Sequence, residues 1–209
     1  MSSEQILAGL QMTVDTYSGL RVVHHLFLIV VFIFFIFFKE KVSRLVSLYI
    51  LLAFLTIFLT SLAPIRNIFY LIVFGFLTIL AILEFLNPKN DYSMKGAPTI
   101  NIIIALVAGF LGFWYSHFVE GYFKALYASP YGVIPCPTLL VILSFFLVFY
   151  PYTNRFFHWV LAIVGLFFGF FGLFVLKVRI DLALLALSLY TLYSLILLGA
   201  KKPQGGEVL

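Results

Sequence analysis

Seven long runs of apolar side chains, separated by short polar segments, constrain the fold more than any other feature of this sequence. The runs cover residues 22–38, 45–63, 68–86, 100–118, 131–150, 156–176 and 182–198. A helix needs about 20 apolar residues to cross the ~30 Å hydrocarbon core of a bilayer, and the runs approach that length. The sequence therefore predicts an all-α, polytopic transmembrane helical bundle with seven spans, or six if one of the short polar segments does not end a helix.

The composition agrees with a membrane environment. Of the 209 residues, 64% are hydrophobic and 10% are charged, against about 45–50% and about 25% in soluble domains. A soluble protein must cover its surface with polar side chains, so the lipid bilayer is the predicted partner. The basic residues behind the net charge of +5 lie singly between apolar runs. This spacing is typical of membrane-protein loops, and we expect no nucleic acid partner.

The distribution of Lys and Arg predicts the orientation. With seven spans, the side that carries the N-terminus holds Arg21, Arg66, Lys124, Lys177 and Arg179. The opposite side holds Lys39, Lys41, Arg44, Lys89, Lys95, Arg155, Lys201 and Lys202. Since basic residues accumulate on cytoplasmic loops, we expect a multi-pass protein of the cell inner membrane with its N-terminus outside. The tail at 199–209 is then cytoplasmic.

The residues before the first apolar run carry a helical pattern of their own. Leu7, Leu10, Val14 and Tyr17 recur at spacings of three and four, so they share one helical face. The pattern predicts an interfacial amphipathic helix within residues 1–21, with a frayed tail as the alternative. Residues 1–209 are then a single transmembrane domain, in which residues 22–198 form the bundle.

Glycines in two of the runs predict close helix packing. Gly165, Gly169 and Gly172 recur along the sixth run, and Gly109 and Gly112 lie in the fourth. Small residues at these spacings allow two membrane helices to approach closely, and we assign these glycines no chemistry.

The fifth run begins with the most unusual local sequence, YGVIPCPT at residues 131–138. Pro137 suits the first turn of a helix, so the fifth helix is expected to start there. The helix that remains spans only about 20 Å, and the preceding residues would have to complete the crossing as non-helical chain. Such backbone must be buried in protein or line a wet cavity, and in transporters it often marks a binding site. A proline-stiffened turn at the membrane surface is the alternative.

This segment also carries a resemblance. YGVIPCPT, followed by an apolar helix, a glycine-rich helix and VRIDLALL, resembles an uncharacterised bacterial family of small multi-pass membrane proteins. That family, a domain of unknown function, has a Gly-x-x-Pro-Cys-Pro signature and a downstream Asp-Leu pair. The resemblance covers roughly residues 131–185. It implies the membrane architecture and draws attention to Cys136 and Asp181, but it implies no activity.

Several ligand-type side chains are predicted to meet at the outer end of the bundle. His24 and His25 open the first span there, and His117 and Glu120 close the fourth, three residues apart on one helical face if that helix continues. Imidazole, carboxylate and thiolate are ligands of zinc and copper, and histidines from two helices also hold haem. We therefore take His24, His25, His117 and Glu120 as candidate metal ligands. The alternative is that they are interfacial side chains, since no compact metal motif occurs.

A second candidate set follows from ionisable groups within the spans, which are costly in lipid and so suggest function. Asp181 opens the seventh span, and Glu84 lies near the cytoplasmic end of the third. With Cys136 and Tyr115 they are the predicted substrate or ion path. A plain ion pair between Lys177 and Asp181, four residues apart, is the alternative for Asp181.

These observations predict a small polytopic membrane protein that binds or moves a small solute or ion, or acts as a membrane subunit of a complex or a homo-oligomer. The alternative is a membrane-embedded metal- or haem-binding protein with redox or hydrolytic activity. No nucleophile elbow, phosphate loop or dinucleotide fingerprint occurs in the sequence. The sequence therefore decides neither for nor against an enzyme, and it fixes no cofactor.

Overall fold

The structure, a computed structural model, describes residues 2–37, 43–62, 68–87, 97–150 and 153–197. Within these ranges the chain is helical throughout, without a strand. The elements are α1 (Ser3–Thr16), α2 (Ser18–Phe37), α3 (Ser43–Thr60), α4 (Ile68–Leu86), α5 (Thr99–Phe113), α6 (Tyr122–Ala128), α7 (Pro135–Val148), α8 (Arg155–Phe170), the π-helical turn η1 (Phe171–Val175) and α9 (Asp181–Leu197). The predicted all-helical bundle is confirmed.

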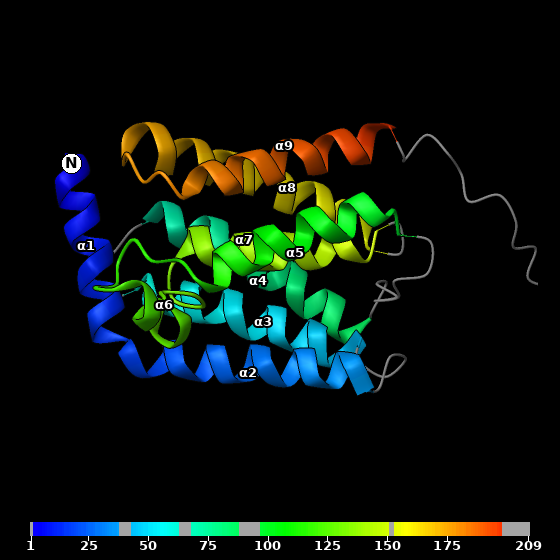
Figure 1. The fold of residues 1–209 in the computed structure, drawn as a ribbon, viewed down its shortest axis with the longest axis horizontal. Helices are drawn as coiled ribbons and strands as arrows, with labels where there is room; N and C mark the ends of the chain where they lie inside the picture. The colour runs from blue at the N-terminus through cyan, green and yellow to red at the C-terminus, as the bar shows by residue number, and fades with distance from the viewer. Residues whose placement is uncertain (1, 38–42, 63–67, 88–96, 151–152, 198–209) are drawn as a thin grey trace, which may run out of the picture.

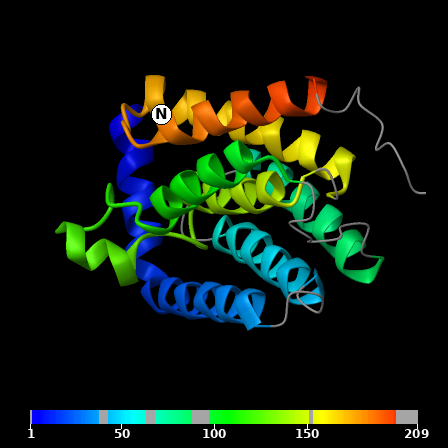
Figure 2. The ribbon, with the colours of Figure 1, turned by 45° about the vertical axis from the view of Figure 1, so that its right-hand side comes forward.

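The longer helices run roughly side by side, and α1 lies across one end of them (Figure 1). We call this the α1 end: α2, α4, α7 and α9 begin there, and α3, α5 and η1 finish there. The turned view in Figure 2 shows α1 and the short α6 at the same end. The residues between α5 and α7 and those between η1 and α9 therefore lie at this end, near α1.

Each of the seven apolar runs overlaps one α-helix, the sixth run also includes η1, and the third run matches α4 to the residue. Helix length does not show seven membrane crossings, however. Among the described residues, two helices are long and apolar enough to cross a membrane, Ile68–Leu86 and Arg155–Val175. A third crossing is counted only if α1 and α2, which are bent by 72° at their junction, are taken as one broken span.

Two of the other apolar helices, α5 and α7, are clearly shorter than the sequence predicted, for a local reason. α5 ends at Phe113 and α7 begins at Pro135, and the residues between them form turns, α6 and irregular chain. At ~1.5 Å per residue, the 14 residues of α7 extend about 21 Å. Apolar composition continues through the irregular segments, so the hydrophobic runs overstate the helices they contain.

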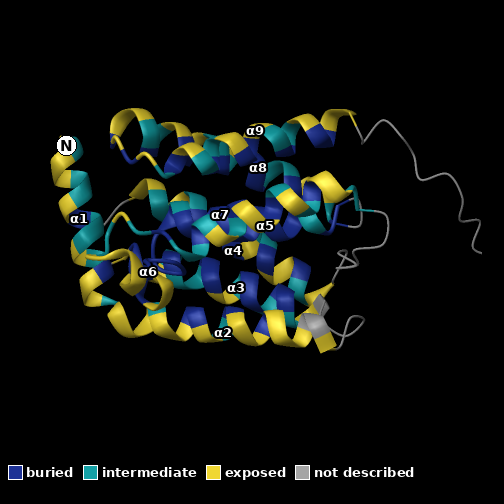
Figure 3. Ribbon diagram, in the orientation of Figure 1, coloured by how far each residue is buried: buried dark blue, intermediate teal, exposed yellow. Residues whose placement is uncertain are grey.

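α7 is the centre of the molecule. Nearly all of its side chains are buried, and it packs against α5, α8 and α9 (Figure 3). It starts two residues earlier than predicted, because Ile134 is its N-cap and Pro135 occupies the first turn, where a missing N–H costs nothing. The outer helices α2, α4 and α9 expose large apolar side chains on their far faces.

Glycines bring two helix pairs into close contact, as predicted. A Cβ on Gly169 would lie 2.6 Å from the Leu185 nitrogen, and one on Gly165 would lie 2.5 Å from the Ser188 hydroxyl, so α8 approaches α9 through them. Gly112 packs on α7 in the same way, since a Cβ there would lie 2.8 Å from Val141. Any larger side chain at these positions has to move its neighbours.

The predicted N-terminal helix is present, but it is shorter and it packs differently. α1 starts with a capping box between Ser2 and Gln5, and α2 already begins at Ser18 rather than after residue 21. The apolar face of α1, with Leu10 and Val14, contacts Ile134 and other residues at the end of the bundle. The predicted apolar face is therefore present, and its side chains pack against the end of the bundle.

The orientation prediction depends mainly on segments outside the described residues. These are residues 38–42, 63–67, 88–96, 151–152 and 198–209, which include most of the basic residues counted on the predicted cytoplasmic side. The predicted cytoplasmic tail at 199–209 lies outside them as well. The orientation stays a prediction.

Candidate functional site

The carboxyl group of Asp181 lies inside the α1 end of the bundle. Asp181 is the first residue of α9, and its side chain is 1% exposed. The Tyr115 hydroxyl donates a hydrogen bond of 2.6 Å to Oδ1, and the Cys136 thiol hydrogen-bonds the same carboxyl group. Three members of the predicted path are therefore in contact, although they come from segments far apart in the sequence.

Gly172 makes room for this carboxyl group. It belongs to the π-helical turn η1, and a Cβ at this position would collide with Asp181 Oδ2. The turn follows α8. In it the Leu176 N–H donates to the carbonyl of Phe171, five residues back, instead of four residues back as in an α-helix. Single π turns of this kind are frequent at functional sites.

The ion pair between Lys177 and Asp181, which the sequence also suggested, does not form. Residues 176–180 are not helical, so the four-residue spacing brings no contact between the side chains. Lys177 is exposed and has a positive φ of 59°, in the left-handed region. Asp181 instead turns toward Tyr115 and Cys136.

Aromatic rings surround the carboxyl group and leave a small cavity of about 10 Å³ beside it. We call this cavity, together with the side chains that line it, the cup. The cup is lined by Asp181 and by the rings of Tyr70, Tyr115, Phe118, Phe168 and Phe171, among other side chains. Its volume is close to that of one water molecule. None of the described Lys and Arg side chains lines the cup or forms an ion pair with Asp181.

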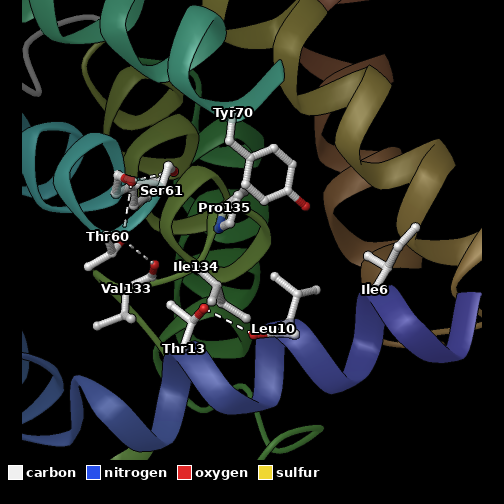
Figure 4. Close-up of a pocket in the computed structure, with 11 residues that line it drawn as sticks. Ile6, Leu10, Thr13, Thr60, Ser61, Tyr70, Val133, Ile134 and Pro135 are labelled. Carbon is white, nitrogen blue, oxygen red and sulfur yellow. Dashed lines mark hydrogen bonds between the residues drawn. The ribbon is translucent and has the colours of Figure 1, made fainter. Parts of the chain in front are cut away.

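A second cavity of about 100 Å³, which we call the chamber, lies between α1 and the ends of the neighbouring helices (Figure 4). It is lined by α1, by α3 near its end, by Tyr70 of α4 and by residues 133–135. The chamber and the cup share the side chains of Leu10, Tyr70, Ile134 and Pro135. The two cavities are therefore neighbours on either side of these side chains, and Leu10 of α1 lines both.

Apart from the Tyr70 hydroxyl, the side-chain polar groups of the chamber are three hydroxyls that already donate their protons. Thr13 donates to the Gly9 carbonyl at 3.0 Å, and Ser61 donates to the Ile57 carbonyl at 2.6 Å. Thr60 also donates to the Ile57 carbonyl, at 3.1 Å (Figure 4). Each hydroxyl oxygen then has only lone pairs to offer a ligand. These three hydroxyl oxygens are therefore hydrogen-bond acceptors for a ligand, and most of the other side chains that line the chamber are apolar.

The YGVIPCPT segment forms a buried, irregular connection at the α1 end, and its position relative to the membrane surface stays a prediction. Residues 129–135 are all buried. Gly132 has a φ of +79°, and a Cβ there would collide with the His24 ring. The Thr138 hydroxyl accepts the Gly132 N–H at 2.9 Å and donates to the Ile134 carbonyl at 2.8 Å, which fixes the turn into α7. The segment thus sets Cys136 against Asp181.

The four candidate metal ligands do not come together. His24 hydrogen-bonds Thr56 at 3.0 Å, and His25 bonds the Arg21 carbonyl at 2.8 Å, both inside the bundle. His117 and Glu120 are exposed, and they share no helical face because α5 has already ended. The described residues contain no group of three or more His, Cys, Asp or Glu side chains that could hold a metal ion.

Glu84, the remaining member of the predicted path, is far from the cup. It lies near the end of α4 that points away from α1, and the Asn154 amide donates to its Oε2 at 3.1 Å. The four residues of the predicted path therefore do not form one continuous group. Cys136, Tyr115 and Asp181 form one site, and Glu84 belongs to the opposite end of the bundle.

A third cavity, larger than the other two, has a different chemistry. It holds about 510 Å³ between α2, α5 and α7, and apolar side chains line almost all of it. Its one hydroxyl, Ser144, donates to the Leu140 carbonyl of its own helix. The cavity holds no ionisable group, so we do not place chemistry there.

The sequence missed three features of the site. The chamber hydroxyls at Thr60 and Ser61 close the second apolar run, where they look like the ordinary polar end of a span. Gly172 was noted for helix packing, and its actual neighbour is a carboxyl group. Tyr70 gave no signal, because single Tyr residues near span ends are common.

Comparison with known proteins identifies no relative. No protein-family model matches the chain, and no curated protein or solved structure is similar enough to count as a match. The resemblance to the uncharacterised membrane family stays a prediction, and the geometry of the site has to carry the functional argument alone.

Proposed function

We propose that this chain is an integral membrane protein that binds a proton or a small cation at Asp181 and carries it, alone or with a coupled solute, across the bilayer. One observation carries the proposal. The Asp181 carboxyl group is buried at the α1 end, and its hydrogen-bond partners are the neutral Tyr115 hydroxyl and Cys136 thiol.

The physical argument is the cost of burying charge. An ionised carboxylate in apolar surroundings is strongly unfavourable unless a cation or several hydrogen bonds compensate for it. Two neutral donors compensate incompletely, and the described basic side chains add nothing. Binding of a proton or of a cation neutralises the buried charge of Asp181. The carboxyl group can therefore exchange a proton for a cation.

Local backbone supports a transport role. A helix that begins after buried irregular chain, as α7 does, and a π turn beside an ionisable group are features of binding sites in transporters. Both border the cup.

The membrane context supports seven crossings. The outer helices expose large apolar side chains such as Ile72, Ile79 and Leu189 on their far faces. At the α1 end, non-helical chain follows α5 and precedes α7, and its residues 129–134 are buried; buried chain of this kind can complete a crossing. We keep the N-terminus outside and the C-terminus cytoplasmic in the inner membrane. A place in a complex or a homo-oligomer stays a prediction.

The test is charge movement in reconstituted vesicles. Purified full-length protein in liposomes, adsorbed on a solid-supported membrane, receives a rapid pH step while the capacitive current is recorded. We expect a transient current from the wild type and a loss of at least about tenfold in Asp181→Asn, because the amide keeps the shape but binds no proton.

Asp15→Asn is the matched control, since Asp15 is an exposed carboxylate on α1 that bonds only to Gln11 among the described contacts. Its current should equal that of the wild type. An equal current from Asp181→Asn, or no current from folded wild-type protein, would overturn the proposal.

A further inference from the structure

We propose that the cup and the chamber together form a binding site for a small primary amine in its protonated form, a short alkylammonium ion. The inference rests on the proposed function, in which Asp181 is the cation-binding group. It adds the identity of the cation and the place where each portion of it lies.

The cup has the chemistry that recognises an ammonium head. Five aromatic rings face a space beside a carboxyl group, and ammonium ions are attracted both to ring faces and to carboxylates. The Tyr70 and Phe168 rings are in contact at 5.5 Å between centroids, and Tyr115 stacks on Phe118 at 6.3 Å, so the rings line the cup as two packed pairs with Phe171 beside them. An anion would meet the ring faces and the carboxylate with repulsion.

Size then selects the kind of ammonium. The cup holds about 10 Å³, which accommodates a group as large as one water molecule. A primary –NH₃⁺ head is of that size, whereas a quaternary nitrogen with three methyl groups is several times larger. The geometry points to a primary amine.

The chamber suits the remainder of the ligand. It offers about 100 Å³ next to the cup, and its walls are mostly apolar, including Ile6, Leu10 and Val133. A short alkyl chain fits there without losing polar partners. The oxygens of Thr13, Thr60 and Ser61 accept hydrogen bonds, so they favour a ligand or a hydrating water that donates.

Neither cavity favours a bare metal cation. The described residues provide no group of three or more His, Cys, Asp or Glu ligands around Asp181. Alkali ions would keep more of their hydration shell than the cup has room for, whereas an ammonium head exchanges water for ring faces at little cost.

The experiment uses the same vesicles with concentration steps at constant pH. The probes are methylammonium, ethylammonium and tetramethylammonium chlorides. We expect currents with the first two and none with the third. Asp181→Asn should lose them. The double variant Thr60→Val with Ser61→Ala, which removes two acceptors with little change in shape, should weaken the apparent affinity for ethylammonium about tenfold.

Thr78→Val is the matched control, because Thr78 is a buried threonine of α4 that also donates to a carbonyl of its own helix, outside both cavities. It should behave as the wild type. Equal weakening in this control, equal currents with tetramethylammonium, or unchanged affinity in the double variant would overturn the assignment.

The two proposals fail differently. Currents on pH steps without currents on alkylammonium steps would sink the amine assignment and leave proton binding at Asp181 intact. Absence of both would remove the proposed function together with the inference.

Discussion

At the scale of single residues, the site depends on a glycine as much as on its polar groups. Asp181 is buried at the start of α9, yet its carboxyl group turns away from the N–H groups of that helix and toward Tyr115 and Cys136. It can do so only because Gly172 leaves the space open. The carboxyl group is therefore placed for exchange with a ligand rather than for capping its own helix.

Gly172→Ala tests this placement. The new methyl group would overlap the Asp181 carboxyl group, so we expect a loss of about 1–3 kcal/mol in stability, seen as a lower melting temperature in detergent. Gly19→Ala is the control, since nothing lies within 4 Å of a Cβ there. Equal melting temperatures for the two variants would contradict the close approach.

Tyr115→Phe tests the hydrogen bond. The ring stays and the hydroxyl is lost, which leaves a buried carboxyl oxygen without its donor and costs about 1–3 kcal/mol. Tyr190→Phe is the comparison, because the Tyr190 hydroxyl donates 2.7 Å to the neutral Asn101 amide. Melting curves should show the larger loss for Tyr115→Phe. A larger loss for Tyr190→Phe would mean that the Asp181 bond adds little.

The sequence drew attention to two of the three residues in this cluster for a physical reason. Asp181 and Cys136 stand out because ionisable and reactive groups are rare and costly in apolar runs. His117 and Glu120 were paired by assuming that their helix continues, and it ends at Phe113. Spacing along a sequence has meaning only within the element that carries it.

At the scale of elements, the irregular segment before α7 holds two polar groups in position. Gly132 lets His24 approach from α2, and three residues later α7 begins and places Cys136 at the cup. Hydropathy predicted α4 to the residue, but it overestimated α5 and α7. The apolar side chains of turns buried in protein look the same as those of helices facing lipid.

Gly132→Ala should be far more harmful than Gly121→Ala. Both glycines have a positive φ, +79° and +90°, so both substitutions strain the backbone, but only Gly132 has His24 against it. We expect a difference in melting temperature that Gly132→Ala combined with His24→Ala partly restores. Indistinguishable single variants, or no rescue, would contradict the contact with His24.

At the scale of the whole molecule, the opposite ends of one bundle have different roles. The α1 end holds the cup and the chamber, and Glu84 and Asn154 lie at the opposite end. The sequence predicted the helical bundle and the number of its apolar runs. It could not predict where the helices end inside those runs, because that depends on burial by the rest of the protein.

Accessibility of engineered cysteines tests the orientation. In a Cys136→Ser background, Lys124→Cys lies on α6 at the α1 end, and Asn87→Cys lies beyond the far end of α4; both native residues are exposed. A membrane-impermeant maleimide added to intact cells should label position 124 and should reach position 87 only after permeabilisation. The reverse pattern would invert the orientation, and labelling of both in intact cells would exclude a membrane between the two ends.

The central claim is that the Asp181 carboxyl group exchanges a proton for an ammonium ion. Infrared difference spectroscopy of the reconstituted protein, recorded with and without methylammonium at one pH, observes this group directly. We predict loss of a protonated-carboxyl band on addition of methylammonium, in the wild type and in Asp15→Asn but not in Asp181→Asn. A spectrum without that band, or one in which Asp181→Asn retains it, would contradict the account.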